Sequence, residues 1–178
     1  MAVAELRRCN DLTIQRFNVS ITNRQRTRAI DLRLLRRITN TVLTELLSAD
    51  NFELGIHLIA TAEMTRLNET FLQHAGSTDV ITFNYSDHAT RTTQHASTLH
   101  GEIFICLDEA VLQSRRFRTP WQSELIRYLV HGLLHLCGHD DAQPAVRRKM
   151  KREENRLLCE LVRRFPLSKL GRRPRVAA

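Results

Sequence analysis

The sequence lacks the features that mark membrane, secreted and fibrous proteins. No stretch approaches the ~18 consecutive apolar residues that a spanning helix needs, so we expect no membrane partner. Charged residues at Glu5, Arg7 and Arg8 interrupt the start of the chain before an apolar leader can form, which predicts a cytoplasmic protein. Internal repeats and long linkers rich in Pro, Gly or Ser are also missing. With 42% hydrophobic and 26% charged residues among 178, the composition is that of one ordinary globular domain.

Cysteine is scarce, and its spacing is uninformative for metal binding. The four cysteines are Cys9, Cys106, Cys137 and Cys159, and no two of them form a CxxC pair. This pattern argues against both a disulfide framework and a four-cysteine metal cluster. We expect reduced thiols, most of them buried as small apolar side chains.

The basic character of the chain is unevenly distributed. The net charge is +8, but residues 161–178 hold six basic and no acidic residues, which leaves 27 − 6 = 21 basic against 19 acidic residues in 1–160. An argument for a nucleic-acid partner must therefore rest on local basic surfaces and not on the net charge. Two candidates stand out, although a solvated helix face is the alternative for both. We predict RNA contacts at Arg28, Arg33, Arg36 and Arg37, and a second run, Arg147-Arg148-Lys149-Lys151-Arg152, could also hold phosphates.

The hydrophobic pattern predicts alternating strands and helices. Strands are expected at 12–21, 52–60, 79–85 and 101–106, and helices at 28–48, 62–73, 108–117, 120–137 and 143–164. Thr119 is the expected N-cap of the fourth helix, with Pro120 in its first turn. We therefore predict a single α+β domain over 1–165, with a small mixed four-stranded sheet flanked by about five helices. A polar loop is expected at 86–98, and a basic, flexible tail at 166–178.

The segment 131–141, HGLLHLCGHDD, is the most informative part of the chain. His131 and His135 are four residues apart, so on a helix they project from one face about one turn apart and can share a metal ion. Gly138 permits a sharp turn at the end of that helix. The turn would bring His139, Asp140 or Asp141 back as a third ligand. Three protein ligands would leave a fourth coordination position for water, as in catalytic zinc sites. The alternative to a metal site is that both are ordinary histidines without a ligand role.

One position in this segment argues against a common metalloprotease mechanism. In H-E-x-x-H proteases the residue after the first histidine is the glutamate that acts as general base. Here that residue is Gly132, which has no side chain. A peptidase that depends on such a base is therefore disfavoured.

The same segment carries a family resemblance. It matches the H-G-x-L-H-L-x-G-Y-D-H signature of YbeY-type rRNA maturation endoribonucleases at His131, Gly132, Leu134, His135, Leu136, Gly138 and Asp140. Residues 67–83 are similar to the family stretch L-N-x-x-Y-R-x-x-x-x-P-T-D-V-L-S-F, and Gly101–Cys106 is similar to G-D-I-x-I-C. The three stretches keep the family's order and spacing.

The resemblance implies a set of site residues, with two departures. The family's third metal-binding histidine is replaced by Asp141, and its arginine in the second stretch is replaced by Leu72. The resemblance implies one Zn²⁺ per chain at the C-terminal end of a helix, bound by His131, His135 and Asp141, with His139 as the alternative third ligand. A metal-bound water is then the expected reacting group. Asp79 is either a residue that orients the site or an ordinary cap of a strand.

The function implied by the resemblance is a zinc-dependent endoribonuclease specific for single-stranded RNA. It would act in maturation of the small-subunit rRNA 3′ end and in ribosome quality control, with rRNA and the small ribosomal subunit or assembly factors as partners. Two alternatives remain. One is a ribosome-assembly binding factor with a structural zinc, which Leu72 favours. The other is a different metallohydrolase such as a peptidase.

Overall fold

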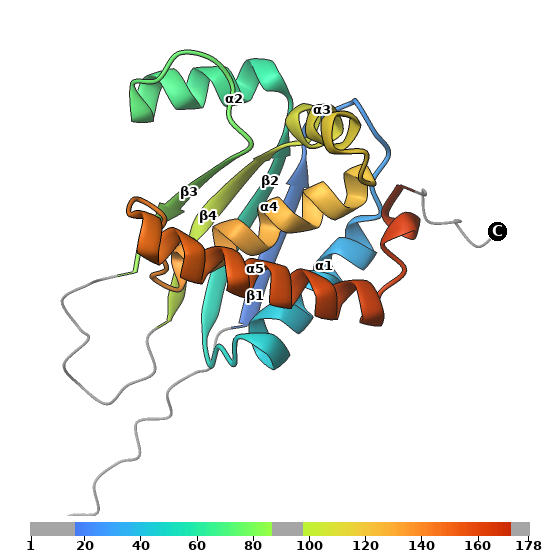
Figure 1. Cartoon of the computed structure of the whole chain (residues 1–178), viewed down its shortest axis with the longest axis vertical. Helices are drawn as coiled ribbons and strands as arrows, with labels where there is room; N and C mark the ends of the chain where they lie inside the picture. Colours follow the sequence, from blue (N-terminus) through green and yellow to red (C-terminus); the bar gives the residue numbers. More distant parts are fainter. Residues whose placement is uncertain (1–16, 87–97, 172–178) are drawn as a thin grey trace, which may run out of the picture.

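A four-stranded mixed sheet forms the centre of the protein (Figure 1). The computed structural model describes residues 17–86 and 98–171. The strand order is β1-β2-β4-β3, where β1 is Phe17–Asn23, β2 is Phe52–Ile59, β4 is Leu99–Cys106 and β3 is Val80–Asn84. The first three are parallel, and β3 pairs antiparallel with β4. The predicted small mixed sheet is confirmed; residues 12–16 of the first predicted strand and most of the predicted loop at 86–98 lie outside the described residues.

The helices pack on both faces of the sheet, and the core on one face is much larger than the core on the other. They are α1 (Leu32–Thr41), α2 (Thr61–Leu67), α3 (Leu107–Phe117), α4 (Trp121–Leu136) and α5 (Pro144–Arg164), with the shorter turns η1 (Val42–Leu46), η2 (Asn68–Leu72) and η4 (Leu167–Gly171). The main core joins apolar side chains of α1, α4 and α5 to one face of the sheet. Because strand side chains alternate between faces, Ile103 and Ile105 enter this core, whereas Cys106 enters a smaller cluster with Met64 of α2.

Helix α4 lies very close to the sheet. A Cβ atom on Gly132 would be 2.7 Å from Cγ2 of Ile103 on β4 and 3.2 Å from Oγ1 of Thr82 on β3. The residue after the first histidine of the motif therefore faces the sheet. This close approach explains why glycine is found there.

Two predicted helix starts are wrong. Thr119 is not an N-cap: α4 begins at Trp121, Pro120 is the capping residue, and the Thr119 hydroxyl donates to Glu124 at 2.6 Å. The helix predicted from residue 28 begins only at Leu32, because the carboxylate of Asp31 accepts hydrogen bonds from the first backbone N–H groups of α1.

The predicted tail is shorter than expected at its start. Residues 167–171 form η4, in which Leu167 and Leu170 are buried against the main core. The carbonyl of Leu170 accepts a hydrogen bond from the backbone N–H of Asp31 at 2.9 Å. These apolar contacts hold residues 167–171 of the predicted tail against the core. Residues 172–178 lie outside the described residues.

The cysteines in the described part of the chain are free thiols. Cys106 is buried, Cys137 is partly buried and Cys159 is exposed, while Cys9 lies outside the described residues. Within the same part of the chain, no helix is both long and apolar enough to cross a membrane.

Candidate metal site

The C-terminal end of α4 turns the chain back on itself. Gly138 has φ +85°, and its N–H donates to the carbonyl of His135 at 2.9 Å. The N–H of His139 donates to the carbonyl of Leu134 at 3.0 Å. These two bonds make a Schellman motif, in which glycine takes the left-handed position after the cap. The return of the chain brings residues 139–141 beside the last turn of the helix.

Three side chains meet at this helix end. One nitrogen each of His131 and His135 and one carboxylate oxygen of Asp141 all lie within 4.8 Å of one another. The two Nε2 atoms are 3.1 Å apart. All three residues are partly buried. His139 is absent from this group, and its carbonyl oxygen instead lies against the ring of His135.

The hydrogen bonds of the two rings determine which nitrogens carry protons. Nδ1 of His135 donates to the carbonyl of His139 at 3.1 Å, and Nδ1 of His131 donates to the carboxylate of Glu154 at 3.2 Å. Because both acceptors are oxygen atoms, each neutral ring has its proton on Nδ1 and a bare lone pair on Nε2. Two lone pairs then face each other beside a carboxylate, and this donor set fits a cation such as zinc.

The environment of His135 favours the neutral, metal-binding form. Burial lowers the pKa of His135, and the positive charge that His131 would carry lowers it further. Three weaker effects raise the pKa of His135: the negative charges of Asp141 and Asp140, and the hydrogen bond to the carbonyl of His139. A neutral imidazole is the form that binds a metal ion.

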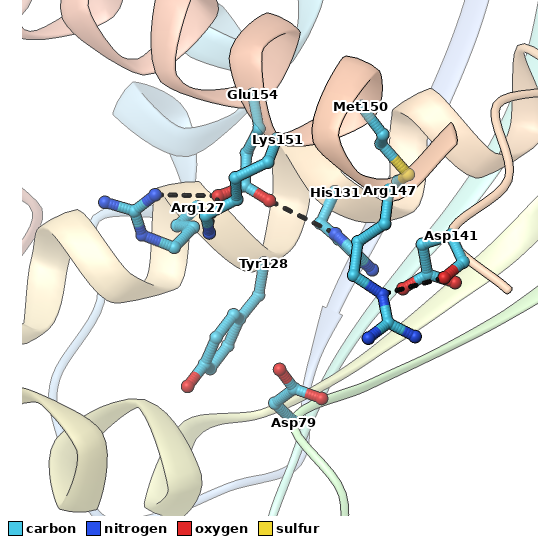
Figure 2. A pocket seen from close by; sticks show the side chains of 9 residues that line it. All are labelled: Asp79, Arg127, Tyr128, His131, Asp141, Arg147, Met150, Lys151 and Glu154. Atoms are coloured by element: carbon cyan, nitrogen blue, oxygen red, sulfur yellow. Dashed lines mark hydrogen bonds and ion pairs between the residues drawn. The ribbon is translucent and has the colours of Figure 1, made fainter. Parts of the chain in front are cut away.

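Glu154 of α5 is a buried carboxylate that holds one of the metal-binding side chains in place. Its side chain is 3% exposed and accepts hydrogen bonds from Arg127 at 2.7 Å, Lys151 at 2.7 Å and His131 at 3.2 Å (Figure 2). Burial raises the pKa of Glu154, but the bonds from His131, Lys151 and Arg127 outweigh it and bring the pKa down to about 2. Glu154 is therefore a carboxylate at neutral pH, and it fixes the orientation of the His131 ring.

Glu154 is not among the site residues that the sequence predicts, although the sequence holds a signal for it. The buried face of α5 consists of Met150, Glu154, Leu157, Leu158 and Leu161. An acidic residue within an apolar stripe of a helix requires partners, because a buried charge is costly without them. That pattern could have singled out Glu154 but would not have named the residues that it binds.

A pocket of about 340 Å³ opens beside the metal-binding group. Figure 2 shows the side chains that line it: Asp79, Arg127, Tyr128, His131, Asp141, Arg147, Met150, Lys151 and Glu154. Asp79 precedes β3 and thus reaches the pocket from the sheet. Its Oδ1 accepts hydrogen bonds from the N–H of Val80 at 3.0 Å and the hydroxyl of Thr78 at 3.1 Å. The residue therefore caps the start of the strand and also lines the pocket.

Arg147 places a cation next to the ligand group. Its Nε donates to the carbonyl of Asp141 at 2.8 Å, and Figure 2 shows its guanidinium pointing toward Asp79. Its terminal nitrogens have no partner among the described residues. Leu72, where the family motif has arginine, lies on η2 with 47% of its surface exposed and is not part of this pocket.

The four arginines predicted to contact RNA lie elsewhere. Arg33 and Arg37 line a separate hollow with Arg164 and Lys169, and the Arg37 guanidinium lies 5.9 Å from the ring centre of Phe165. Arg28 and Arg36 are exposed, and Arg28 precedes the helix. Phe165 follows the last residue of α5, whereas the metal-binding group lies beside the first turns of α5. The structure therefore does not bring these arginines to the metal-binding group.

The fold and the site together define a single α+β unit with two histidines and a carboxylate, at one helix end, that could hold a metal ion. The model of the family described as Endoribonuclease YbeY matches residues 20–162 of the chain. The chain belongs to the YbeY family. The resemblance noted in the sequence is thus confirmed.

Individual relatives agree with the family match. Proteins named Endoribonuclease YbeY are 40% identical over 94 residues in Salinibacter ruber and 35% identical over 107 residues in Bacteroides fragilis. These alignments cover 52% and 60% of this chain, and 60% and 71% of the relatives. The chain thus spans less than two thirds of the Salinibacter protein. A solution structure of a Thermotoga maritima protein shares the fold, with a TM-score of 0.56 and 22% identity over 89% of this chain and 100% of that one.

Proposed function

We propose that the chain is a zinc-dependent endoribonuclease that cleaves single-stranded RNA. Its role would be maturation of the small-subunit rRNA 3′ end and ribosome quality control in the cytoplasm, with the small subunit or assembly factors as partners. The observation that carries the proposal is the convergence of His131, His135 and Asp141 at the edge of a pocket that also holds Arg147. Membership of the YbeY family supports the choice of RNA as substrate.

The residues that would hold the ion are His131, His135 and Asp141. A zinc ion bound there supplies Lewis acidity, which polarises a phosphoryl oxygen and makes water more acidic. Two imidazoles and a carboxylate are a donor set that catalytic zinc sites use. The partly buried position of the three residues keeps the group accessible from the pocket.

The protein's own side chains would bind and orient the RNA. Arg147 is fixed through its Nε, so its terminal nitrogens are free to bind a phosphate in a forked geometry. Asp79 uses Oδ1 for the start of β3. Its Oδ2 would accept a hydrogen bond from the attacking hydroxyl group. Glu154 pairs with both Arg127 and Lys151, and Glu124 also pairs with Arg127, whereas Arg147 has no carboxylate partner among the described residues. Arg147 is therefore the unpaired cation at the ligand group.

An assembly factor with a structural zinc is the second candidate. Leu72, in place of the family's arginine, is the observation that favours it, because this chain lacks one cation that the family motif provides. This reading predicts tight RNA or ribosomal-protein binding without metal-dependent cleavage. The peptidase reading is weaker, since Gly132 faces the sheet and cannot present a base.

The test combines metal content with activity. Elemental analysis of protein purified without chelators should find about one zinc per chain in the wild type and little in His135→Ala. The wild type should cleave single-stranded RNA, lose this activity with a chelator and leave peptides intact. Zinc-loaded protein that binds RNA but does not cleave it would support the assembly factor, and protein that takes up no transition metal would exclude both zinc proposals.

A further inference from the structure

The two halves of α5 differ in how their basic residues are neutralised. In the C-terminal half, Arg156 pairs with Glu153 at 2.6 Å, Arg163 and Arg164 pair with Glu160, and Arg164 also pairs with Glu45 at 2.7 Å. The N-terminal half holds Arg147, Arg148, Lys149, Lys151 and Arg152, all exposed. Of these five, only Lys151 has a carboxylate partner among the described residues. The uncompensated positive charge of α5 thus lies within residues 147–152.

This arrangement is unfavourable for the helix itself. The N-terminus of a helix carries a partial positive charge, so basic residues there are destabilising, and α5 has no acidic residue in its first turn. Arg148 and Arg152 are four residues apart, so these like charges face each other on the helix surface. Binding of an anion would relieve both effects.

The basic N-terminal half of α5 is continuous with the metal-binding pocket. Arg147 and Lys151 line that pocket, as Figure 2 shows. Lys151 also lines a second hollow, together with Arg148, Arg152 and Asn155. Lys151 therefore lies at the boundary between the metal-binding pocket and the second hollow. An extended polyanion could lie along this surface with one phosphate at the ligand group and its neighbours along α5.

We propose that the N-terminal half of α5 is the binding track for the sugar-phosphate backbone of single-stranded RNA. The track runs from Arg148 and Arg152, past Lys151, to Arg147 beside the metal-binding group. The proposal rests on the proposed function and identifies where that site takes its substrate. It assigns the backbone contacts to α5 rather than to the arginines around α1.

The position of the α1 arginines supports this assignment. Arg37 packs on Phe165, which lies 18 positions beyond Arg147 in the sequence. At 1.5 Å per residue, these 18 positions correspond to about 27 Å along the helix axis. A strand held at Arg33 and Arg37 would thus lie nearly a full helix length from the metal-binding group, whereas the α5 track leads directly into it.

The test compares two double variants of the full-length chain. R148Q/R152Q removes two cations from the track, and R156Q/R163Q removes two ion-paired cations from the same helix, so both change the net charge equally. Binding of a fluorescein-labelled single-stranded RNA is measured by anisotropy at several salt concentrations, with a chelator present to prevent cleavage. A third variant, R33Q/R36Q, tests the surface around α1.

The proposal predicts a specific pattern. R148Q/R152Q should bind about tenfold more weakly at low salt, and its log–log salt dependence should fall by roughly 1.4, since each phosphate contact to a single strand contributes ~0.7. R156Q/R163Q and R33Q/R36Q should stay within about twofold of the wild type. Equal losses in the two α5 variants, a loss confined to R33Q/R36Q, or no RNA binding by the wild type would each overturn the proposal.

Cleavage assays with added zinc separate this inference from the proposed function. If the predicted binding pattern is observed but neither the wild type nor any variant cleaves RNA with metal, the N-terminal half of α5 is an RNA-binding surface and the nuclease proposal fails. If the wild type cleaves RNA and R148Q/R152Q binds and cleaves equally well, the nuclease proposal stands and the track is wrong.

Discussion

The carboxylate of Asp141 stands where the family's signature has its third histidine, and this exchange changes the charge of the site. A carboxylate binds zinc at a distance similar to that of an imidazole nitrogen, so the geometry can be kept. It also adds a negative charge, which makes a bound ion a weaker Lewis acid than three neutral imidazoles would. The Schellman turn, which is made by backbone groups, brings residue 141 to the histidines.

Substitution of Asp141 tests its proposed role as a ligand. We expect Asp141→Ala to lower zinc occupancy and RNA cleavage together, because two imidazoles alone bind zinc weakly. Asp141→His, which restores the family's residue, should retain the ion. Isothermal titration measures zinc affinity and a cleavage assay measures activity. Glu153→Ala, which removes a carboxylate outside the ligand group, is the control. Wild-type zinc affinity in Asp141→Ala would remove this residue from the ligand set.

Glu154 should control metal affinity without contacting the ion. In Glu154→Ala the ring of His131 loses its acceptor, and we expect zinc affinity to fall by about 10–100-fold, the usual effect of losing such a partner. Glu154→Gln should fall less, since the amide oxygen can still accept from Nδ1 of His131. Glu153→Ala is the matched control, because Glu153 binds the exposed Arg156. Equal affinities for Glu154→Ala and Glu153→Ala would contradict the role.

The sequence reveals local relations between site residues better than distant ones. The spacing of His131 and His135 follows from helix geometry alone, and both lie where the helical pattern places them. The choice between Asp141 and His139 depends on the turn at Gly138, which sequence spacing leaves open. Glu154 is 23 residues from His131 and meets it only because α5 packs on α4. Such a contact needs the tertiary structure.

At the scale of elements, the approach of α4 to the sheet depends on Gly132. In an exposed helix, Gly→Ala would stabilise by about 1 kcal/mol. Here we expect Gly132→Ala to destabilise by about 1–3 kcal/mol, because the added methyl group would lie 2.7 Å from Ile103 and force a shift in the core. Urea unfolding measures the change. A variant more stable than the wild type would show that α4 can move away at little cost.

Asp108, in the first turn of α3, joins three segments at the C-terminal edge of the parallel strands. One carboxylate oxygen accepts a hydrogen bond from the hydroxyl of Thr27, which follows β1. The other accepts bonds from the N–H of Thr61 at 2.8 Å and its hydroxyl at 3.0 Å, at the start of α2. Burial raises the pKa of Asp108, but these hydrogen bonds outweigh it, and the pKa is lowered.

The lowered pKa of Asp108 predicts a pH-dependent stability. A carboxyl group with a lower pKa in the folded state stabilises the fold above its unfolded pKa of about 3.9, and this contribution is lost as the pH falls. Asp108→Asn should therefore reduce stability by about 1–2 kcal/mol at pH 7. The difference from the wild type should shrink below about pH 4. Urea unfolding at pH 7 and pH 3.5 tests this, and a constant difference would contradict it.

Element types were more predictable than element ends. The apolar spacing correctly predicts helices over most of 62–73, 108–117 and 143–164. The ends depend on single hydrogen bonds, which pattern does not specify. Asp31 stops the first helix from extending back to residue 28, and Thr119 binds Glu124 instead of capping α4.

At the scale of the whole molecule, strand order is the feature that sequence pattern could not supply. Alternation identifies strands and their buried faces, but not that β4 lies between β2 and β3. That order decides the site, because it puts β3 next to β4 beneath α4, and the residue just before β3 is Asp79, which lines the pocket. The burial of Leu167 and Leu170 likewise depends on partners in distant elements.

Metal binding should stabilise the entire fold, because the unfolded chain lacks the assembled site. An ion at 100 times its dissociation constant adds about 2.7 kcal/mol to the free energy of unfolding. For a domain of this size each kcal/mol raises the melting temperature by about 2–4 °C, so we expect zinc to raise it by about 5–10 °C. Thermal unfolding followed by circular dichroism, with zinc or with a chelator, measures the shift.

Two controls make this shift diagnostic of the proposed ligands. Magnesium should give little stabilisation, because it prefers oxygen ligands and retains its water, whereas two of the three groups here are imidazoles. His135→Ala should remove the zinc effect but leave the fold intact, since its ring is only partly buried and packs at the helix end. An equal zinc shift in His135→Ala would place the ion elsewhere in the molecule and separate metal binding from the pocket that Arg147 and Asp79 line.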